Sequence, residues 1–394
     1  MTTMRLQNIM VVDDEPDLQM LILQKFRKQI QNDTYKFFFA ENGEEALNLL
    51  EDKSEISLIL TDINMPKMDG LTLLQKLQDS ENPALKTVIV SAYGDMENIR
   101  TAMNRGAFDF ITKPIDFKDL ELTIEKGIRE ISLLYESLQQ KKQLDAVQVD
   151  LDTAARIQQK MLPQDFPAFP DRKEFNIYAE MHTAKEVGGD LYDYFMLDEN
   201  RLGFIIGDVS GKGVPASIYM AVSRTMLRAI ASQIDDPAEC LSTVNKMLIP
   251  ESDLTTFVTV FYGILDTRNG HVQYSNGGHN LPYIIRADGS VEEVENTGGL
   301  LLGKIEPIEF ETKELQLAPG EKIVLFTDGV TEAMNENEEL YDEEKLIEYL
   351  TGRNEDNLNK ILRGVIVDVL KFMNKANQAD DITLLAMEYV GDSE

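Results

Sequence analysis

The chain has 394 residues, 43% of them hydrophobic, and carries 69 acidic against 38 basic side chains, a formal net charge of −31. This length exceeds one ordinary domain, so two or three folded domains are expected. The negative charge argues against nucleic acid as a partner, because phosphate binding needs clustered lysine and arginine. No stretch approaches the apolar length of a membrane-spanning helix, which predicts no membrane insertion. A single cysteine, Cys240, and the lack of a recognisable signal peptide predict a cytoplasmic protein without an internal disulfide.

Short apolar segments alternate with amphipathic ones over the first 120 residues. Helices are expected at 18–30, 43–50 and 71–78, among others. Strands are expected at 9–12, 37–40, 58–61, 87–90 and 108–111. Strands separated by helices of this length indicate a parallel sheet. This pattern predicts an α/β doubly wound, flavodoxin-like domain, whose active site lies at the carboxyl ends of the strands.

Residues 117–161 contain no proline and one glycine, Gly127, which predicts a long helix that ends before Pro163. Six residues, all apolar or small except Gln158, recur there at the spacing of a coiled-coil seam: Leu144, Val147, Leu151, Ala154, Gln158 and Met161. A second run, Ile131, Leu134 and Leu138, is out of register with the first. Two interpretations stay open: a helix packed on its own domains, or a coiled-coil linker that makes a homodimer.

The pattern changes after Pro170 to β-rich segments separated by glycine turns. Helices are expected at 214–233, 343–350 and 358–374. Strands are expected at 175–180, 201–207, 256–266, 271–276, 282–286, 322–327 and 383–389. Many strands with few helices predict an α+β layered domain rather than a second parallel sheet.

Polar residues stand at the ends of the predicted N-terminal strands. Asp13 and Asp14 end the first strand, Asp62 the third and Ser91 the fourth, and Lys113 follows the fifth. Three carboxylates at one sheet edge repel one another by roughly 4 kcal/mol per pair at an effective dielectric constant near 20. Such a cluster needs a cation, and oxygen ligands favour Mg²⁺. A carboxylate beside Mg²⁺ and a lysine is suited to attack a phosphoryl group.

The segments VVDDE, LTDINMPKMDG, VSAYG and FITKP resemble the motif set of response-regulator receiver domains over residues 5 to about 125. The resemblance implies that Asp62 is the phospho-acceptor. It also implies that Asp14, Asp62 and the carbonyl of Asn64 bind Mg²⁺, with Asp13 acting through water.

The same resemblance implies that Ser91 and Lys113 contact the phosphoryl group. Phe110 would be the switch aromatic, at a position that is often tyrosine in the family. The implied partner is a sensor histidine kinase or a phosphotransfer protein.

Four acidic motifs are spread over the C-terminal half: VGGD (Asp190), IGDVSGKG (Asp208), LFTDGVTEA (Asp328) and QADDITLL (Asp380, Asp381). Three adjoin strand-like runs, so their carboxylates are expected to meet at strand ends. A carboxylate site without histidine or cysteine ligands selects Mg²⁺ or Mn²⁺. Two such cations lower the pKa of a shared water and direct it at phosphorus. We therefore expect these aspartates to be metal ligands of a phosphoester hydrolase.

Seven segments, among them IQQKMLP, VGGDLYDYF, GDVSGKGVPA and DDITLLAMEY, resemble the SpoIIE-like branch of the metal-dependent PPM-type protein phosphatases. The resemblance runs from about residue 150 to the C-terminus. It implies a β-sandwich flanked by helices and a dinuclear Mn²⁺ or Mg²⁺ site. By motif, Asp208, the Val209 carbonyl, Asp328 and Asp380 would be ligands, with Asp190 acting through water. The implied substrate is a phosphoserine or phosphothreonine of an anti-anti-sigma-type (STAS) protein.

These patterns predict a receiver domain at 1–125, a helical linker at 126–162 and a phosphatase domain at 163–394. Two rival functions remain. The VGGD segment resembles the GGDEF signature of diguanylate cyclases, which predicts a nucleotide-binding motif upstream and little chain downstream. The other rival is a scaffold that keeps the phosphatase fold without catalysis. His279 is interpreted as a turn-stabilising residue or as a proton donor.

Overall fold

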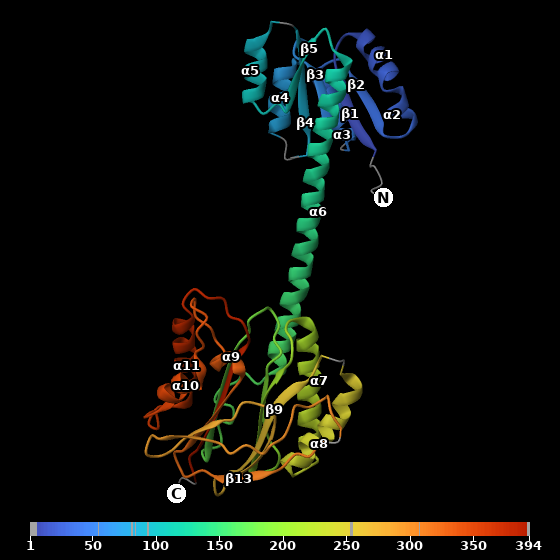
Figure 1. The fold of residues 1–394 in the computed structure, drawn as a ribbon. Helices are drawn as coiled ribbons and strands as arrows, with labels where there is room; N and C mark the ends of the chain where they lie inside the picture. Colours follow the sequence, from blue (N-terminus) through green and yellow to red (C-terminus); the bar gives the residue numbers. More distant parts are fainter. Residues whose placement is uncertain are drawn as a thin grey trace. The chain divides into compact units, whose positions relative to one another are not determined.

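The structure is a computed structural model and describes residues 6–53, 55–79, 82, 84–92, 94–252, 255–306 and 308–391. The chain divides into two compact units, Met1–Ala146 and Val147–Glu394. The division falls within helix α6 (Phe117–Met161), labelled in Figure 1. This helix has the extent that the sequence predicts. Among the helices of the described ranges, none has both the length and the apolar character needed to cross a bilayer.

The N-terminal unit is built on a five-stranded parallel sheet of order β2-β1-β3-β4-β5. Its strands are β1 (Gln7–Val12), β2 (Tyr35–Ala40), β3 (Leu58–Asp62), β4 (Lys86–Ala92) and β5 (Asp109–Lys113). Its other helices are α1 (Pro16–Lys25), α2 (Arg27–Gln31), α3 (Gly43–Asp52), α4 (Gly70–Gln78) and α5 (Met96–Asn104). This is the flavodoxin-like order, which confirms the predicted fold.

Alternate residues of each central strand face opposite layers of helices. On β1, Ile9 and Val11 pack with α1 and the first turns of α6, while Met10 and Val12 pack with α3 and α4. Both faces are therefore apolar, as expected for a parallel sheet covered on each side. The polar residues that end the strands are left at the carboxyl edge.

The C-terminal unit contains two five-stranded sheets, of order β13-β10-β9-β8-β7 and β12-β11-β14-β15-β6. The first comprises β7 (Leu191–Met196), β8 (Arg201–Val209), β9 (Val258–Asp266), β10 (His271–Gly277) and β13 (Lys313–Gln316). The second comprises β6 (Phe175–His182), β11 (Tyr283–Ile285), β12 (Val291–Glu293), β14 (Lys322–Phe326) and β15 (Ile382–Tyr389). All their strand pairs are antiparallel.

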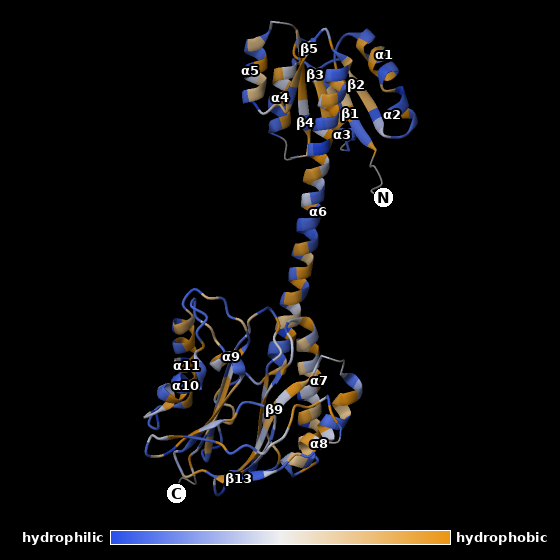
Figure 2. Cartoon of the chain, in the orientation of Figure 1, coloured by the Kyte–Doolittle hydropathy of each residue, from blue (hydrophilic) through white to orange (hydrophobic). Residues whose placement is uncertain are grey.

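The two sheets pack face to face, with side chains such as Phe204, Phe261 and Leu385 between them. One outer face is covered by α7 (Val214–Ala231) and α8 (Pro237–Leu248), which leads into a 3₁₀ turn at Ile249–Glu251. The other is covered by α10 (Asp342–Leu350) and α11 (Leu358–Met373), and α9 (Asp328–Thr331) follows β14. Figure 2 shows largely hydrophobic strands, whereas α6 mixes both kinds of residue. The predicted sandwich flanked by helices is confirmed.

Candidate active sites

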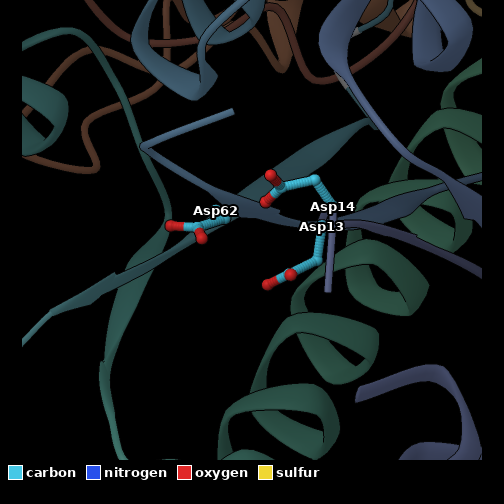
Figure 3. A group of neighbouring side chains, drawn as sticks. All are labelled: Asp13, Asp14 and Asp62. Carbon is cyan, nitrogen blue, oxygen red and sulfur yellow. The ribbon is translucent and has the colours of Figure 1, made fainter. Parts of the chain in front are cut away.

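Three carboxylates meet at the carboxyl edge of the parallel sheet. Asp13 and Asp14 follow β1, and Asp62 is the last residue of β3. Figure 3 shows them converging from these two strands. One oxygen of each lies within 4.8 Å of the others, with Asp62 buried and Asp14 exposed. Such an oxygen-only set fits a hard cation such as Mg²⁺.

Lys113, at the end of β5, ties this cluster together. Its Nζ lies 2.7 Å from Asp62 Oδ2 and 3.0 Å from both Asp13 Oδ2 and Glu15 Oε1. Burial lowers the pKa of Lys113, but the ion pairs outweigh it, so its pKa lies above the usual value. Burial raises the pKa of Asp13, and Lys113 opposes that rise. The lysine therefore offsets part of the repulsion among the carboxylates.

The remaining predicted receiver residues surround Asp62. The backbone N–H of Asn64 donates to Asp62 Oδ1 at 3.3 Å. Ser91 is buried on β4, one strand over from Asp62, and its hydroxyl donates to Asp95 Oδ2 at 3.3 Å. The ring of Phe110 on β5 is exposed. Their roles in phosphoryl contact and switching stay predictions.

Both sheets of the C-terminal unit contribute acidic residues to a second site. Asp190 directly precedes β7 and Asp208 lies in β8, while Asp328 follows β14 and Asp380 and Asp381 precede β15. Asp208 lies close enough to Asp190 and Asp328, and Asp328 to Asp380, for their charges to interact, so positions scattered in the sequence come together here. The structure thus brings together the acidic motifs that the sequence singles out.

Asp381 is held by the backbone of the loop that leads to Asp190. Its Oδ1 accepts from the N–H of Ala184, and its Oδ2 accepts from the N–H of Gly189, both at 2.7 Å. A Cβ at Gly188 would lie 2.3 Å from Asp381 Oδ2, so the loop needs glycine there. Both Asp381 oxygens therefore fasten this loop, a role that its prediction as a metal ligand did not foresee.

The other carboxylates are crowded and poorly solvated. Burial raises the pKa of Asp208 to about 7, with Asp328 adding to the rise. Burial also raises the pKa of Asp328 to about 6 and that of Asp190 well above its usual range. Asp190 is oriented by Thr327, whose hydroxyl donates to Asp190 Oδ2 at 2.8 Å. Carboxyl groups with raised pKa values are difficult to ionise together, and a bound cation would stabilise their charged forms.

The Val209 carbonyl lies beside these carboxylates. A Cβ at Gly189 would stand 2.8 Å from Val209 O and 3.6 Å from Asp208 Oδ1, so glycine keeps this carbonyl accessible. Carboxylate and carbonyl oxygens together form a donor set for Mg²⁺ or Mn²⁺. The residues present therefore fit the metal site that the sequence implies.

Lys212 is a residue of this site that the sequence analysis did not identify. Its Nζ lies 2.7 Å from Asp380 Oδ2 and also donates to the carbonyl of Ala379. It stands between Gly211 and Gly213, both with positive φ, which form the turn of the GDVSGKG motif. The sequence feature that could have identified it is a lysine inside a glycine turn, four residues after the predicted ligand Asp208.

His279 fits the turn-stabilising interpretation. Its N–H donates to Asn276 Oδ1 at 2.9 Å, and Asn276 Nδ2 donates to the His279 carbonyl at 2.8 Å. Its Nδ1 lies 2.9 Å from Thr259 Oγ1. Burial lowers the pKa of His279 to about 4, so the ring is neutral at neutral pH.

The family models agree with both sites. The model for the response regulator receiver domain matches residues 9–125, and the model for stage II sporulation protein E (SpoIIE) matches residues 198–390. The chain therefore joins an N-terminal response regulator receiver domain to a C-terminal domain of the SpoIIE type. The VGGD segment directly precedes strand β7, next to this matched region, which favours the phosphatase interpretation over the cyclase.

Two relatives and one solved structure are similar to the chain. Protein IcfG of Synechocystis sp. is 29% identical over 309 residues, 68% of this chain and 48% of that protein. Phosphoserine phosphatase RsbU of Bacillus subtilis is 30% identical over 205 residues, 51% of this chain and 60% of that protein. The chain thus spans less than two thirds of either relative. The SiaA-PP2C domain of Pseudomonas aeruginosa superposes with a TM-score of 0.56 at 21% identity, covering 62% of this chain and 98% of that one. This last likeness supports the fold.

Proposed function

We propose that this protein is a response regulator in which phosphorylation of Asp62 controls a metal-dependent protein serine/threonine phosphatase. The observation that carries the proposal is the presence of two separate acidic clusters, one in each unit. The first contains Asp62 paired to Lys113. The second gathers aspartates with raised pKa values, such as Asp208.

The receiver cluster is arranged for transfer of a phosphoryl group to an aspartate. An Asp62 oxygen forms the new bond to phosphorus while the bond to the donor, a sensor histidine kinase or phosphotransfer protein, breaks. Lys113, 2.7 Å from Asp62 Oδ2, offsets the charge of the phosphoryl group. Asp14, Asp62 and the Asn64 carbonyl would hold Mg²⁺, which would supply further charge compensation.

The second cluster is arranged for hydrolysis of a phosphoserine or phosphothreonine. Asp208, the Val209 carbonyl, Asp328 and Asp380 would hold the cations. Two Mn²⁺ or Mg²⁺ ions bound there would supply a water of lowered pKa and would stabilise charge on phosphorus. The chain's own groups do the rest: Thr327 orients Asp190, and Lys212 offers a cation to the phosphate. The products are the free hydroxyl side chain and inorganic phosphate.

The proposed substrate is an anti-anti-sigma-type (STAS) protein. Support comes from the family resemblance and from RsbU, a relative named as a phosphoserine phosphatase. The test is a pull-down with the Asp208→Asn variant, followed by mapping of phosphosites on what it retains. Retention of unphosphorylated proteins only would contradict a phosphoprotein substrate.

The proposed coupling between the domains runs through α6 and a homodimer. Leu144 and Val147 on α6 are 70% and 56% exposed, which supports a seam that a second copy covers. We also propose domain limits of 1–125 for the receiver, 126–162 for the helical linker and 163–394 for the phosphatase domain. Leu144→Asp combined with Leu151→Asp is expected to leave turnover insensitive to the receiver's state. Sedimentation velocity with and without beryllofluoride measures the pairing. A double variant that pairs and responds as the wild type does would contradict this route.

The direct test of the activity uses a phosphoserine peptide. The purified chain is expected to release phosphate with Mn²⁺ or Mg²⁺ and to lose this activity in EDTA. Undiminished hydrolysis in EDTA would rule out the metal mechanism. A folded chain that binds Mn²⁺ but releases no phosphate from any phosphopeptide would favour the scaffold instead.

A further inference from the structure

A small pocket lies beside the acidic residues of the phosphatase unit, between the segment that follows α9 and the end of α11 (Figure 1). Its volume is about 90 Å³. Its walls include Ala333 and Met373, which are buried, and Met334, which is exposed. Sites for whole small molecules usually measure roughly 300–1,000 Å³, so this pocket has the size for one side chain of a larger partner.

The pocket adjoins the place where the phosphate of a substrate would bind. Asp380, a proposed metal ligand, lines it together with Lys212, whose Nζ lies 2.7 Å from Asp380 Oδ2. Gly329, the residue after the proposed ligand Asp328, lines it as well. Successive residues of an extended chain are roughly 3.3–3.6 Å apart, so a peptide whose phosphoserine is at the metal site has its neighbouring residues at this pocket. The occupant is therefore a side chain close to the phosphorylated residue in the substrate's own sequence.

Glu332 gives the pocket a negative charge at its solvent side. It lines the pocket, is exposed, and lies close enough to Asp328 for its charge to raise the pKa of Asp328. Within the part of the chain that the structure describes, the Glu332 carboxylate makes no ion pair. Apolar walls below an unpaired carboxylate match a lysine or arginine, whose aliphatic stem packs on apolar surface while the charged end stays in water.

Other occupants fit these charges less well. An apolar side chain would take water away from Glu332 without pairing its charge, which costs free energy. An acidic side chain would be repelled by Glu332 and Asp380. A phosphoserine with a charge of about −1.5 to −2 is also repelled by a chain of net charge −31, and a basic neighbour in the substrate reduces that repulsion.

We propose that this pocket binds a lysine or arginine side chain that lies near the phosphorylated residue of the substrate. Glu332 pairs with the charged end, and Met334 and Met373 pack against the stem. The inference rests on the proposed phosphatase function and deepens it, because it assigns the sequence preference of the phosphatase site to a pocket outside the metal-binding residues.

The test measures kcat/KM of the full chain, in saturating Mn²⁺, on a series of synthetic phosphoserine peptides. The reference peptide has alanine on both sides of the phosphoserine, and lysine, norleucine or glutamate replaces one alanine at a time. At one position, lysine should raise kcat/KM about 2–5-fold over norleucine, which has a similar stem without the charge. Norleucine should in turn exceed alanine, and glutamate should be the poorest. High salt should remove the advantage of lysine over norleucine but keep that of norleucine over alanine.

Two variants assign the preference to Glu332. Glu332→Gln keeps the shape of the side chain and removes its charge, so the lysine peptide should fall to the rate of the norleucine peptide while the alanine peptide is unchanged. Glu332→Lys should reverse the order of the lysine and glutamate peptides. Glu348→Gln is the matched control, because it removes the same charge from an exposed position on α10 of the same unit. The wild-type series decides the question if neither Glu332 variant folds.

The outcomes separate this inference from the function on which it rests. A wild type that hydrolyses the lysine and alanine peptides equally at every position would overturn the inference alone. The same holds if Glu332→Gln slows the lysine and alanine peptides by the same factor, since Glu332 would then act at the metal site and not in recognition. A wild-type chain without Mn²⁺-dependent turnover of any phosphopeptide would overturn the proposed function and this inference with it.

Discussion

The two acidic sites of the molecule differ in how their charges are balanced. In the receiver, Lys113 makes ion pairs with Asp13, Asp62 and Glu15, so the chain itself supplies a positive charge at this site. In the phosphatase unit, Lys212 pairs with Asp380, while Asp208 and Asp190 keep raised pKa values in a buried setting. In the receiver site, a lysine of the chain therefore offsets part of the repulsion among the carboxylates. In the phosphatase site, buried carboxylates keep raised pKa values, and a bound cation would stabilise their charged forms.

The largest expected effect comes from removing a carboxylate of the phosphatase site. Asp208→Asn should reduce turnover of a phosphoserine peptide by more than the roughly 100-fold typical of losing a residue that merely orients a ligand. Metal-free stability should not fall, because the change relieves repulsion with Asp328. Asp288→Asn, in an exposed turn, is the control. Wild-type turnover in Asp208→Asn would exclude this aspartate from the metal site.

Metal removal should distinguish the two units by calorimetry. Mn²⁺ at 100 times the Kd of the phosphatase site adds about 2.7 kcal/mol to the stability of that unit. For a unit of this size the midpoint should rise by roughly 5–10 °C. The receiver transition should move less, since Lys113 already compensates its carboxylates. Equal shifts of both transitions would contradict the proposed difference in charge compensation between the two sites.

His279 gives the phosphatase unit a pH dependence of stability. Burial lowers its pKa to about 4 in the folded state, against an ordinary value of 6.5. The pKa of His279 is lower in the folded than in the unfolded protein. The stability that its neutral ring contributes is therefore fully present above pH 6.5 and is lost as the pH falls toward 4. The free energy of unfolding is expected to fall by about 1.4 kcal/mol per pH unit, or by roughly 2 kcal/mol between pH 6.5 and pH 5.

Urea unfolding in EDTA at several pH values measures this contribution. The stability of the wild type should fall relative to that of His279→Gln below pH 6.5, since glutamine does not titrate. The raised pKa values of Asp208 and Asp328 act in the opposite direction but are common to both proteins. Parallel curves for the two proteins would show that His279 is not held neutral.

Lys212 should have the smallest effect of the set. If its ammonium contacts the substrate phosphate, Lys212→Met should raise the KM for a phosphopeptide about 10-fold, equivalent to about 1.4 kcal/mol. Lys212→Arg, which keeps the charge, should have a KM close to that of the wild type. Lys185→Met, an exposed lysine on the nearby loop, is the control. An unchanged KM in Lys212→Met would remove this lysine from the substrate site.

The sequence predicted the folds and the location of both acidic clusters because these depend on strong local signals. Alternating strands and helices defined the receiver sheet, and the absence of proline between Phe117 and Met161 defined α6. Helix α8 was not predicted, although Asp236 caps its N-terminus and Pro237 occupies its first turn. Strand β7 was also missed, since it follows the VGGD motif without a break.

The side chains that hold the sites together could not be read from the sequence. Gln158 occupies a position predicted for an intermolecular seam, yet it hydrogen-bonds to Gly188, 30 residues further along its own chain. Asp381 looked like a ligand because it adjoins Asp380, yet both its oxygens accept backbone N–H groups. Such contacts depend on how segments distant in the sequence meet in the fold, and the spacing of residues along the chain does not predict them.

Phosphorylation of Asp62 in the receiver is proposed to control the rate at the phosphatase site, and one measurement tests this coupling most directly. Turnover of a phosphoserine peptide by the full chain, in saturating Mn²⁺, is compared with and without beryllofluoride for the wild type and Asp62→Ala. The account predicts a change in wild-type rate within the roughly 5–150-fold range of typical allosteric coupling, and no change in Asp62→Ala. An active wild type whose rate ignores beryllofluoride, or an Asp62→Ala variant that responds equally, would contradict it.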